Sequence, residues 1–316
     1  MKKTISKYLV FIGIFLVSTL VRAQQDPQFT HYMYNMSVIN PAYATDNAGV
    51  INLGGLYRTQ WVGAVGAPKT ATLFAHSPVA KRVEVGISFV NDAIGDVVKE
   101  NNIYADVAYV LPVSAKNKLS FGVKGGLTLF DVDFNGFQYT SEQDDPAFAN
   151  NISKTFPNVG VGTYFFSDKY YLGFSIPNLL TTKHLDRQDG IQTTGVEAIH
   201  YFFTGGYVFD LNPNLKFKPA FMAKGVSGAP VAIDLTANFL VNNLIEAGVG
   251  YRLDDSISGL VGFYITPKLR IGYSYDYTLT NFGKYNSGTH EIFLLFELGS
   301  SNNASKKGYD KSPRFF

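Results

Sequence analysis

Long stretches of this chain alternate between apolar residues and small or polar ones, which is the period of a β-strand with two different faces. Residues 269–277 read LRIGYSYDY, so a leucine, an isoleucine and three tyrosines share one face, while arginine, glycine, serine and aspartate share the other. About fourteen segments follow this rule. They lie near residues 49–59, 69–76, 82–91, 100–111, 118–133, 156–167, 169–176, 196–210, 214–225, 231–241, 244–253, 256–265, 268–279 and 289–298.

The two faces favour a membrane barrel over a soluble sandwich, although a sandwich also alternates and turns its apolar face inward. The small or charged face is rich in glycine and serine, which suits a crowded or watery lumen, and the chain has 30 glycines. The other face repeatedly ends in tyrosine or phenylalanine, as a lipid-facing band with aromatic girdles does. We therefore expect an all-β fold, a transmembrane antiparallel barrel of about 14 strands, an even number as in bacterial barrels.

The connections between these segments fall into two classes, which is the signature of an outer-membrane barrel. Short turns rich in Asn, Pro, Asp and Ser are expected at 77–81, 112–117, 168, 211–213, 242–243 and 266–267. Longer connections are expected at 60–68, 135–155, 177–195 and 281–288. This sorting predicts long loops outside the cell and both termini in the periplasm.

The start of the chain is typical of an export signal. Residues 1–23 combine a basic beginning, the apolar run 8–21 and a cleavage motif that ends at Ala23; an uncleaved anchor is the alternative. Four of the 27 basic residues lie there, which leaves 23 against 25 acidic residues. Nucleic-acid binding therefore loses its electrostatic basis, and no nucleic-acid partner is expected. The chain has no cysteine, so a large core or a closed sheet must hold it together.

Four parts of the chain are expected. They are a signal peptide at 1–23, a periplasmic arm or partial plug at 24–48, the barrel at 49–299 and a periplasmic tail at 300–316. Such tails are usually loose ends. The alternative is a short docking peptide, whose candidate residues are Arg314, Phe315 and Phe316.

Catalysis finds little support in the sequence. The five histidines are scattered without the spacing of a metal site. Ser287, His290 and Glu291 are close in sequence and suggest a barrel lipase, but a nucleophile needs a base and an oxyanion hole placed in space. We expect no catalytic residue, no metal and no cofactor.

Charged residues on the small-polar face are expected to line the lumen. The two signs are mixed, which suggests a network of pairs that braces the wall; a path for a solute or peptide is the alternative. Pro219 lies within one of these strands and lacks a ladder donor, so we expect a β-bulge there. The lumen candidates are Lys124, Lys216, Lys218, Lys224, Asp234, Arg270 and Asp276.

The stretch after the export signal carries a resemblance to a known family. Residues 25–44 read QDPQFTHYMYNMSVINPAYA, with D-P-Q-F followed by tyrosine and then N-P-A-Y-A. This closely resembles the start of the PorP/SprF family of outer-membrane proteins of the type IX secretion and gliding machinery. Further similar stretches follow in order and cover essentially the whole chain after the signal. They include YRTQWVGAVGAPKT at 57–70, FPNVGVGTYFFSDKYYLGFSIPNLL at 156–180 and LVGFYITPKLRIGYSYDYT at 260–278.

The resemblance implies a non-enzymatic role in exporting or anchoring large surface proteins in Bacteroidota. The SprF-like branch serves an adhesin that carries a type B C-terminal domain, and we favour this branch. The PorP-like branch works with periplasmic ring and motor components. The implied partners are an exported adhesin or its C-terminal domain, other type IX components and outer-membrane lipid. A small-solute diffusion channel is the competing class of function.

The stretch 25–44 is aromatic, weakly charged and neither helical nor strand-like in pattern. Because each buried ring removes a large apolar area from water, we expect it to fold into the periplasmic mouth of the barrel as a partial plug; a periplasmic arm that binds a partner is the alternative. Trp61 is expected to anchor at the membrane interface or to contact cargo. The plug or partner candidates are Phe29, Tyr32, Tyr34, Asn40, Pro41, Tyr43, Arg58 and Trp61.

Overall fold

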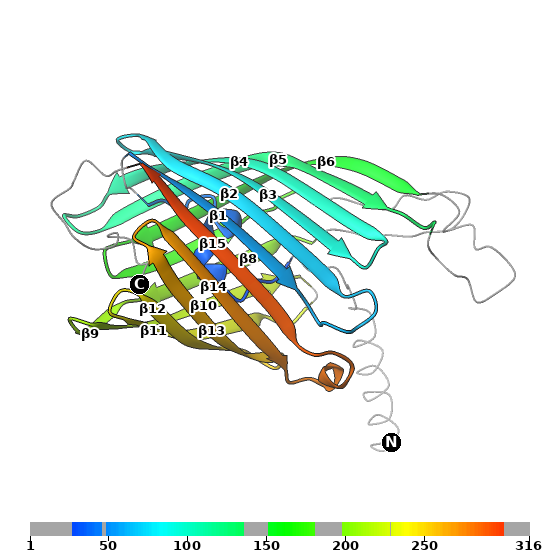
Figure 1. Cartoon of the computed structure of the whole chain (residues 1–316). Helices are drawn as coiled ribbons and strands as arrows, with labels where there is room; N and C mark the ends of the chain where they lie inside the picture. Colours follow the sequence, from blue (N-terminus) through cyan, green and yellow to red (C-terminus); the bar gives the residue numbers. More distant parts are fainter. Residues whose placement is uncertain (1–26, 46–48, 136–150, 181–197, 228, 300–316) are drawn as a thin grey trace, which may run out of the picture.

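The computed structural model describes residues 27–45, 49–135, 151–180, 198–227 and 229–299. Its strands form one tilted wall in which each strand is antiparallel to its neighbours, and the pairing of β10 with β11 closes the ring (Figure 1). The strands are β1 (Val50–Thr59), β2 (Pro68–Ala80), β3 (Val83–Ile94), β4 (Val98–Pro112), β5 (Lys118–Val132), β6 (Ile152–Phe166), β7 (Tyr170–Ile176), β8 (His200–Tyr207), β9 (Phe209–Asn212), β10 (Leu215–Val226), β11 (Ala232–Val241), β12 (Ile245–Arg252), β13 (Ser256–Thr266), β14 (Leu269–Thr278) and β15 (Thr289–Gly299).

The wall has fourteen positions, because β8 and β9 are two halves of one strand. Both pair with β10, and only Val208 separates them. The predicted fourteen-stranded antiparallel barrel is therefore confirmed.

The expectation of a β-bulge at Pro219 is wrong. This residue pairs with Ala237 of β11 without any shift in register. On the other side, the pairing to β9 ends at Phe217 and the pairing to β8 resumes at Ala220. The missing proline donor is thus accommodated by a break in the neighbouring strand, and the register of β10 is kept.

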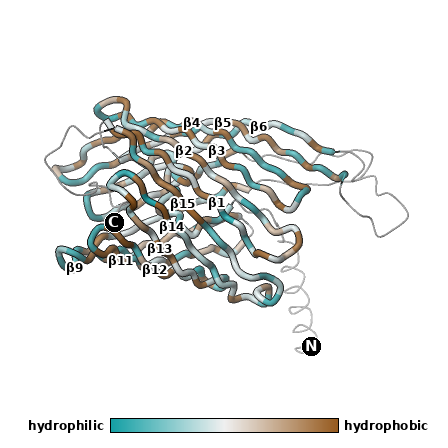
Figure 2. The backbone as a smooth tube through the Cα atoms, in the orientation of Figure 1, coloured by the Kyte–Doolittle hydropathy of each residue, from teal (hydrophilic) through white to brown (hydrophobic). Residues whose placement is uncertain are grey.

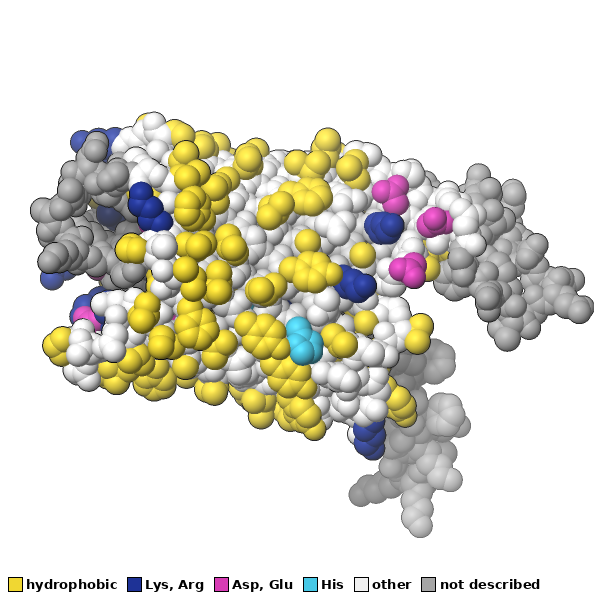
Figure 3. Space-filling model, in the orientation of Figure 1, with side chains coloured by type: hydrophobic (Ala, Val, Ile, Leu, Met, Phe, Trp, Pro, Cys, Tyr) yellow, Lys and Arg dark blue, Asp and Glu magenta, His cyan; other side chains and the backbone are white. Residues whose placement is uncertain are grey.

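The strands turn their polar face inward and their apolar face outward. In β14, Arg270, Ser274 and Asp276 are buried inside, whereas Tyr273 and Tyr277 are exposed on the outer surface. The alternation is visible along the wall in Figure 2, and apolar side chains cover much of the outer face in Figure 3. An apolar outer band around a polar interior is the arrangement of a membrane barrel. No helix among the described residues is long and apolar enough to cross a membrane.

The two ends of the barrel differ in their connections, as the sequence predicted. At one end, here called the short-turn end, the connections are 81–82, 113–117, 167–169, 213–214, 242–244 and 267–268. At the opposite end, here called the long-loop end, the short connections 95–97, 227–231 and 253–255 lie beside the longer ones 60–67, 133–151, 177–199 and 279–288. Asn242 and Asn243 both have a φ of 52°, and they are the central residues of a β-turn that the Leu244 N–H closes onto the Val241 carbonyl. Such a turn matches the right-handed twist of the strands.

The described part of the arm, residues 27–45, lies inside the barrel. It contains the short helices η1 (Tyr32–Tyr34) and α2 (Met36–Ile39), drawn in blue within the wall in Figure 1. Thr45 bonds to Glu84, which lies near the short-turn end of β3. Thr30 bonds to Glu291, the third residue of β15 from the long-loop end. The arm therefore runs along the lumen from one end towards the other.

The course of the arm separates the two ends of the described chain. The arm reaches well beyond the mouth at the short-turn end, and Pro27 lies among residues near the long-loop end. The last strand finishes at Gly299, which pairs with Val50 at the short-turn end. The two ends of the described chain thus lie towards opposite ends of the barrel. The expected signal peptide at 1–23 and the tail at 300–316 fall outside the described residues.

A charge on the outer face should destabilise the barrel far more than the same charge in a turn. Val123, well inside β5, is 58% exposed on the outer face, and Val113, in a short turn, is 60% exposed. Val123→Lys should lower the free energy of unfolding by about 2–4 kcal/mol, because lysine is costly within the lipid-facing band. Val113→Lys should leave it nearly unchanged. Urea titration of the barrel in lipid vesicles measures both, and equal effects would contradict the assignment of the faces.

Candidate functional site

The apolar core of the described molecule is centred on the arm. Tyr32, Met33, Met36 and Ala42 are at most 2% exposed, although most neighbouring wall positions carry polar side chains. Because the outer faces of the strands point to lipid, the buried apolar core forms where the arm packs against inward apolar residues of the wall. The core comprises Phe29, Tyr32, Met33, Tyr34, Met36, Ile39, Ala42, Tyr43 and Ala44 of the arm, with Leu56, Ala108, Val110, Tyr164, Phe166, Tyr171, Phe202, Met222 and Phe293 of the wall.

A buried charged cluster fixes the beginning of the arm. The Glu291 carboxylate accepts hydrogen bonds from the backbone N–H groups of Thr30 and His31, at 2.9 and 2.6 Å, and lies 2.9 Å from His31 Nδ1. The Arg58 guanidinium lies 3.0 Å from Glu291 and 3.0 Å from Asp276. The hydroxyl of Thr30 donates to Asp276 and accepts from Arg58. Each charge in this cluster is paired, as burial requires.

A second cluster holds the middle of the arm. The Tyr34 hydroxyl donates to Glu246 at 2.6 Å and accepts from Arg270 at 2.6 Å. Arg270 also pairs with Glu246, and its guanidinium carbon lies 4.1 Å from the centre of the Tyr34 ring. The Lys218 ammonium is 5.3 Å from the same ring. One tyrosine of the arm is thus held by a charged pair and by cation–π contacts.

A third cluster fixes the end of the arm near the short-turn end. The Glu84 carboxylate accepts from the backbone N–H of Thr45 at 2.8 Å and from its hydroxyl at 3.0 Å. His76 Nδ1 lies 2.7 Å from the same carboxylate. Tyr43 packs edge-on against His76, with 5.3 Å between the ring centres. The arm is therefore attached to the wall at both of its ends.

The segment Asn40–Pro41–Ala42 sits in a notch that glycines leave in the wall. The Asn40 side chain accepts from the Ala42 N–H at 2.9 Å and donates to a backbone carbonyl of β6 at 3.0 Å. A Cβ atom on Gly162 would lie 2.1 Å from Asn40 Oδ1, and one on Gly122 would lie 2.2 Å from the Pro41 carbonyl oxygen. Only glycine allows so close an approach of the arm to the wall at these two positions.

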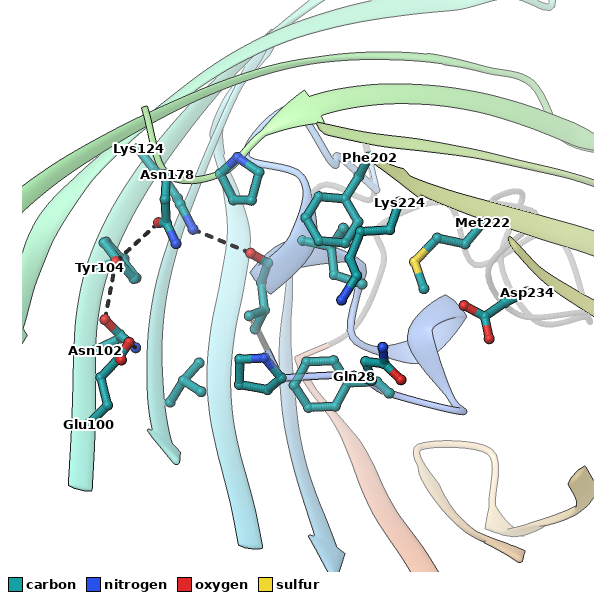
Figure 4. A pocket seen from close by; sticks show the side chains of 16 residues that line it. Gln28, Glu100, Asn102, Tyr104, Lys124, Asn178, Phe202, Met222, Lys224 and Asp234 are labelled. Atoms are coloured by element: carbon teal, nitrogen blue, oxygen red, sulfur yellow. Dashed lines mark hydrogen bonds between the residues drawn. The ribbon is translucent and has the colours of Figure 1, made fainter. Parts of the chain in front are cut away.

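The arm contributes to the lining of two cavities in the barrel. The loop-side cavity has about 700 Å³ of empty space, and Figure 4 shows the side chains that line it. It is lined by Pro27, Gln28, Phe29, Val38, Ile39, Val90, Glu100, Asn102, Tyr104, Lys124, Pro177, Asn178, Phe202, Met222, Lys224 and Asp234. The turn-side cavity has about 320 Å³ of empty space and is lined by Tyr34, Ser37, Tyr43, Asn52, Leu53, Phe74, His76, Leu295, Phe296 and Glu297.

Comparison with known proteins identifies the family of this chain. Residues 21–296 match the family described as type IX secretion system membrane protein PorP/SprF, which is nearly the whole chain. The chain belongs to the PorP/SprF family. Comparison with curated proteins finds no match. The barrel fold and the family together place this PorP/SprF protein in the outer membrane, where it is a component of the type IX secretion system.

Comparison with solved structures finds outer-membrane proteins that resemble this chain at low sequence identity. A FadL homologue from Pseudomonas aeruginosa has a TM-score of 0.48 and 12% identity, over 87% of this chain and 95% of that one. The P. putida toluene transporter TodX has a TM-score of 0.49 and 10% identity, over 84% and 93%. The Ralstonia pickettii toluene transporter TbuX has a TM-score of 0.48 and 11% identity, over 90% and 97%.

The structure of this PorP/SprF protein brings most of the candidate residues together. The arm candidates Phe29, Tyr32, Tyr34, Asn40, Pro41 and Tyr43 are buried in the lumen, and Arg58 joins the first cluster. The lumen candidates Lys124, Lys218, Lys224, Asp234, Arg270 and Asp276 are also buried on the inner face. Lys216 is only half-buried, near the short-turn end of β10. The tail candidates Arg314, Phe315 and Phe316 fall outside the described residues.

Trp61 lies apart from the arm, in the loop after β1. Its indole packs edge-on against Phe282, with 5.0 Å between the ring centres, and its backbone N–H donates to the Thr289 hydroxyl. It therefore connects two loops at the long-loop end.

The residues that suggested a lipase are kept apart by the wall. The His290 ring bonds to Tyr273 in an exposed position on the outside of the barrel, and the Glu291 carboxylate lies inside. Across the described ranges, no group of three or more histidine or acidic side chains is arranged to hold a metal ion.

Sequence reasoning missed the arm's partners. Glu84, Glu246 and Glu291 lie at inward positions of their strands, but nothing in the local sequence connects them with Thr30, His31 or Thr45. The glycine notch was also missed, because Gly122 and Gly162 look like any other small inward residue of a barrel.

Filling the notch should displace the arm. Gly122→Ala places a methyl group against the Pro41 carbonyl, and such overpacking costs about 1–3 kcal/mol. Proteinase K should then cleave the arm several-fold faster while the barrel stays intact. Gly125→Ala is the matched control on the same strand, because a Cβ there meets nothing within 4 Å. Unchanged cleavage in Gly122→Ala would show that the notch does not hold the arm.

Removing the central cation of the first cluster should be strongly destabilising. Arg58→Met leaves Asp276 and Glu291 buried without their cation, which typically costs about 3–5 kcal/mol. Denaturant unfolding measures the loss. Lys169→Met is the control, since its pair with Asp210 is solvent-exposed and should contribute nothing measurable. Equal effects of the two variants would argue against a paired, buried cluster.

Proposed function

We propose that this protein is the dedicated outer-membrane partner of a large exported adhesin, as in the SprF-like branch of its family. In this role it assists export and holds the adhesin's type B C-terminal domain at the outer membrane, with a role in gliding where the adhesin serves that purpose. The proposal is supported by one observation above all. The lumen is occupied by the protein's own arm, which is buried and attached to the wall at both ends.

An arm seated in this way argues against free diffusion through the barrel. A solute would have to pass the buried side chains of Tyr32, Met33 and Met36, which are each at most 2% exposed. A blocked barrel suits a protein that binds another protein at its rim. The small-solute channel is therefore the weaker alternative.

The two ends of the barrel bear on the choice between the branches. We infer that the long-loop end faces outward and the short-turn end faces the periplasm, as in outer-membrane barrels generally. The larger protein surface is then available to an exported partner at the cell surface. The short turns offer less surface to periplasmic ring components, and this favours the SprF-like over the PorP-like role. In this orientation the barrel ends in the periplasm at Gly299, while Pro27 lies towards the cell surface.

Native purification tests the proposal directly. The tagged protein is extracted from its own outer membrane in mild detergent, and mass spectrometry identifies what accompanies it. We expect a large adhesin or its C-terminal domain. Periplasmic ring components in its place would move the protein to the PorP-like role.

Conductance is the second readout. The wild-type barrel should conduct almost no current in a planar bilayer, and Gly122→Ala, with its arm displaced, should conduct more. A protein that purifies alone and conducts freely with its arm intact would overturn the proposal in favour of a channel.

A further inference from the structure

Two outward lysines lie on either side of one small residue near the long-loop end of the barrel. Lys69 and Lys99 are each the second residue of their strand, β2 and β4, counted from that end. The strand β3 runs between them, and its Ala93 pairs with Lys69 on one side and with Lys99 on the other. Because neighbouring strands are about 4.8 Å apart, the backbones of the two lysines are about 10 Å apart across the alanine.

The ammonium groups of both lysines lack a partner in the described part of the chain. Both side chains are exposed, and neither forms a hydrogen bond or an ion pair with a described residue. Asp131 pairs with Lys99 in the ladder on the side away from Lys69, and Asp96 lies in the turn between β3 and β4. Neither carboxylate forms an ion pair with a lysine among the described residues. The two ammonium groups beside Ala93 are therefore available to a group from outside the chain.

The position of the two lysines along their strands corresponds to the surface of the membrane. A strand needs about 9–11 residues to cross the hydrocarbon core, whereas β2 has 13 residues and β4 has 15. The ends of both strands therefore extend beyond the hydrocarbon, to the level of the lipid headgroups. Figure 3 shows Lys and Arg side chains on the outer face towards the long-loop end. An outward lysine is tolerated at this level, although it is costly at the bilayer midplane.

The outer face changes from charged to apolar within three successive rows of paired residues. Between the lysines and the apolar band, Asn91 donates to Asn101 at 2.8 Å. In the row beyond, Leu73 is 62% exposed and Ile103 is 51% exposed. This order of cation, amide and apolar side chain matches the order of phosphate, linkage and acyl chain in a membrane lipid. The three rows are Lys69–Ala93–Lys99, Ala71–Asn91–Asn101 and Leu73–Phe89–Ile103.

We propose that Lys69 and Lys99 together bind the phosphate of an acylated membrane lipid, which sits over Ala93 with its acyl chains on the Leu73–Phe89–Ile103 row. With the long-loop end outward, as inferred above, this is a lipid of the outer leaflet. A free phosphate ion could meet the two lysines but would gain nothing from the apolar row, and this favours the lipid. The site rests on the position of the barrel in the membrane and does not need the adhesin.

Lipid binding to the purified full-length barrel in mild detergent tests the site by native mass spectrometry. Phosphatidic acid is compared with a diacylglycerol of the same acyl chains, which lacks only the phosphate. The wild type should bind phosphatidic acid about ten- to thirtyfold more tightly, because each basic side chain near an anionic headgroup contributes about fivefold. The double variant Lys69→Met and Lys99→Met should lose most of this preference and bind diacylglycerol as before. The control Lys81→Met and Lys116→Met makes the same charge change in exposed short turns and should keep the preference.

A further double variant, Lys69→Arg and Lys99→Arg, keeps both charges and should retain the preference for phosphatidic acid. Equal binding of the two lipids by the wild type, or a preference that survives in the methionine variant, would overturn the proposal. Displacement of phosphatidic acid by millimolar inorganic phosphate would assign the lysines to a free anion and overturn the lipid site as well. An adhesin that accompanies the protein in native purification, without phosphate-selective lipid binding, would overturn this site and leave the proposed function standing.

Discussion

The hydrogen bonds between inward carboxylates of the wall and the arm are the interaction on which the rest of the structure depends. Glu291 accepts hydrogen bonds from backbone N–H groups at one end of the arm, and Glu84 accepts one at the other end. Glu246 accepts a hydrogen bond from the Tyr34 hydroxyl. A buried carboxylate without such partners is very costly. A buried backbone donor without an acceptor is costly too. The carboxylates of the wall and the polar groups of the arm therefore satisfy each other, and this allows a barrel with a polar inner face to have a packed interior.

How far the sequence predicts this structure depends on whether each feature is local. Strands follow from a two-residue period, so Arg270 and Asp276 could be placed on the inner face of β14 from sequence alone. The turn at Asn242 and Asn243 follows from residue types that accept a positive φ. The arm is different, because Thr30 and Glu291 are 261 residues apart. Its apolar composition predicted burial in the barrel, but only three-dimensional packing decides its course along the lumen.

The N-P-A stretch of the arm has a physical explanation in the notch. Asn40 closes a tight turn by accepting from the Ala42 N–H, and Pro41 brings no donor of its own into a buried position. Ala42 is fully buried, and its small side chain allows the segment to lie against the wall. Gly122 and Gly162 complete the fit from the other side. The fit between the N-P-A segment and the two glycines could not be inferred from either part of the sequence alone. The first is compatible with an ordinary turn, and the second with an ordinary strand.

The position of the arm links binding at the loop-side cavity to closure of the barrel. Phe29, Val38 and Ile39 line that cavity and belong to the same segment that the carboxylate clusters and the notch hold in place. A ligand that contacts these residues binds the seated arm and has fewer contacts when the arm is displaced. By mass action it stabilises the seated arm by a free energy that rises with the logarithm of ligand concentration over Kd. A change that lowers the fraction of molecules with a seated arm therefore weakens the apparent affinity for the ligand by that fraction. In such a barrel, binding in this cavity and seating of the arm are one linked equilibrium.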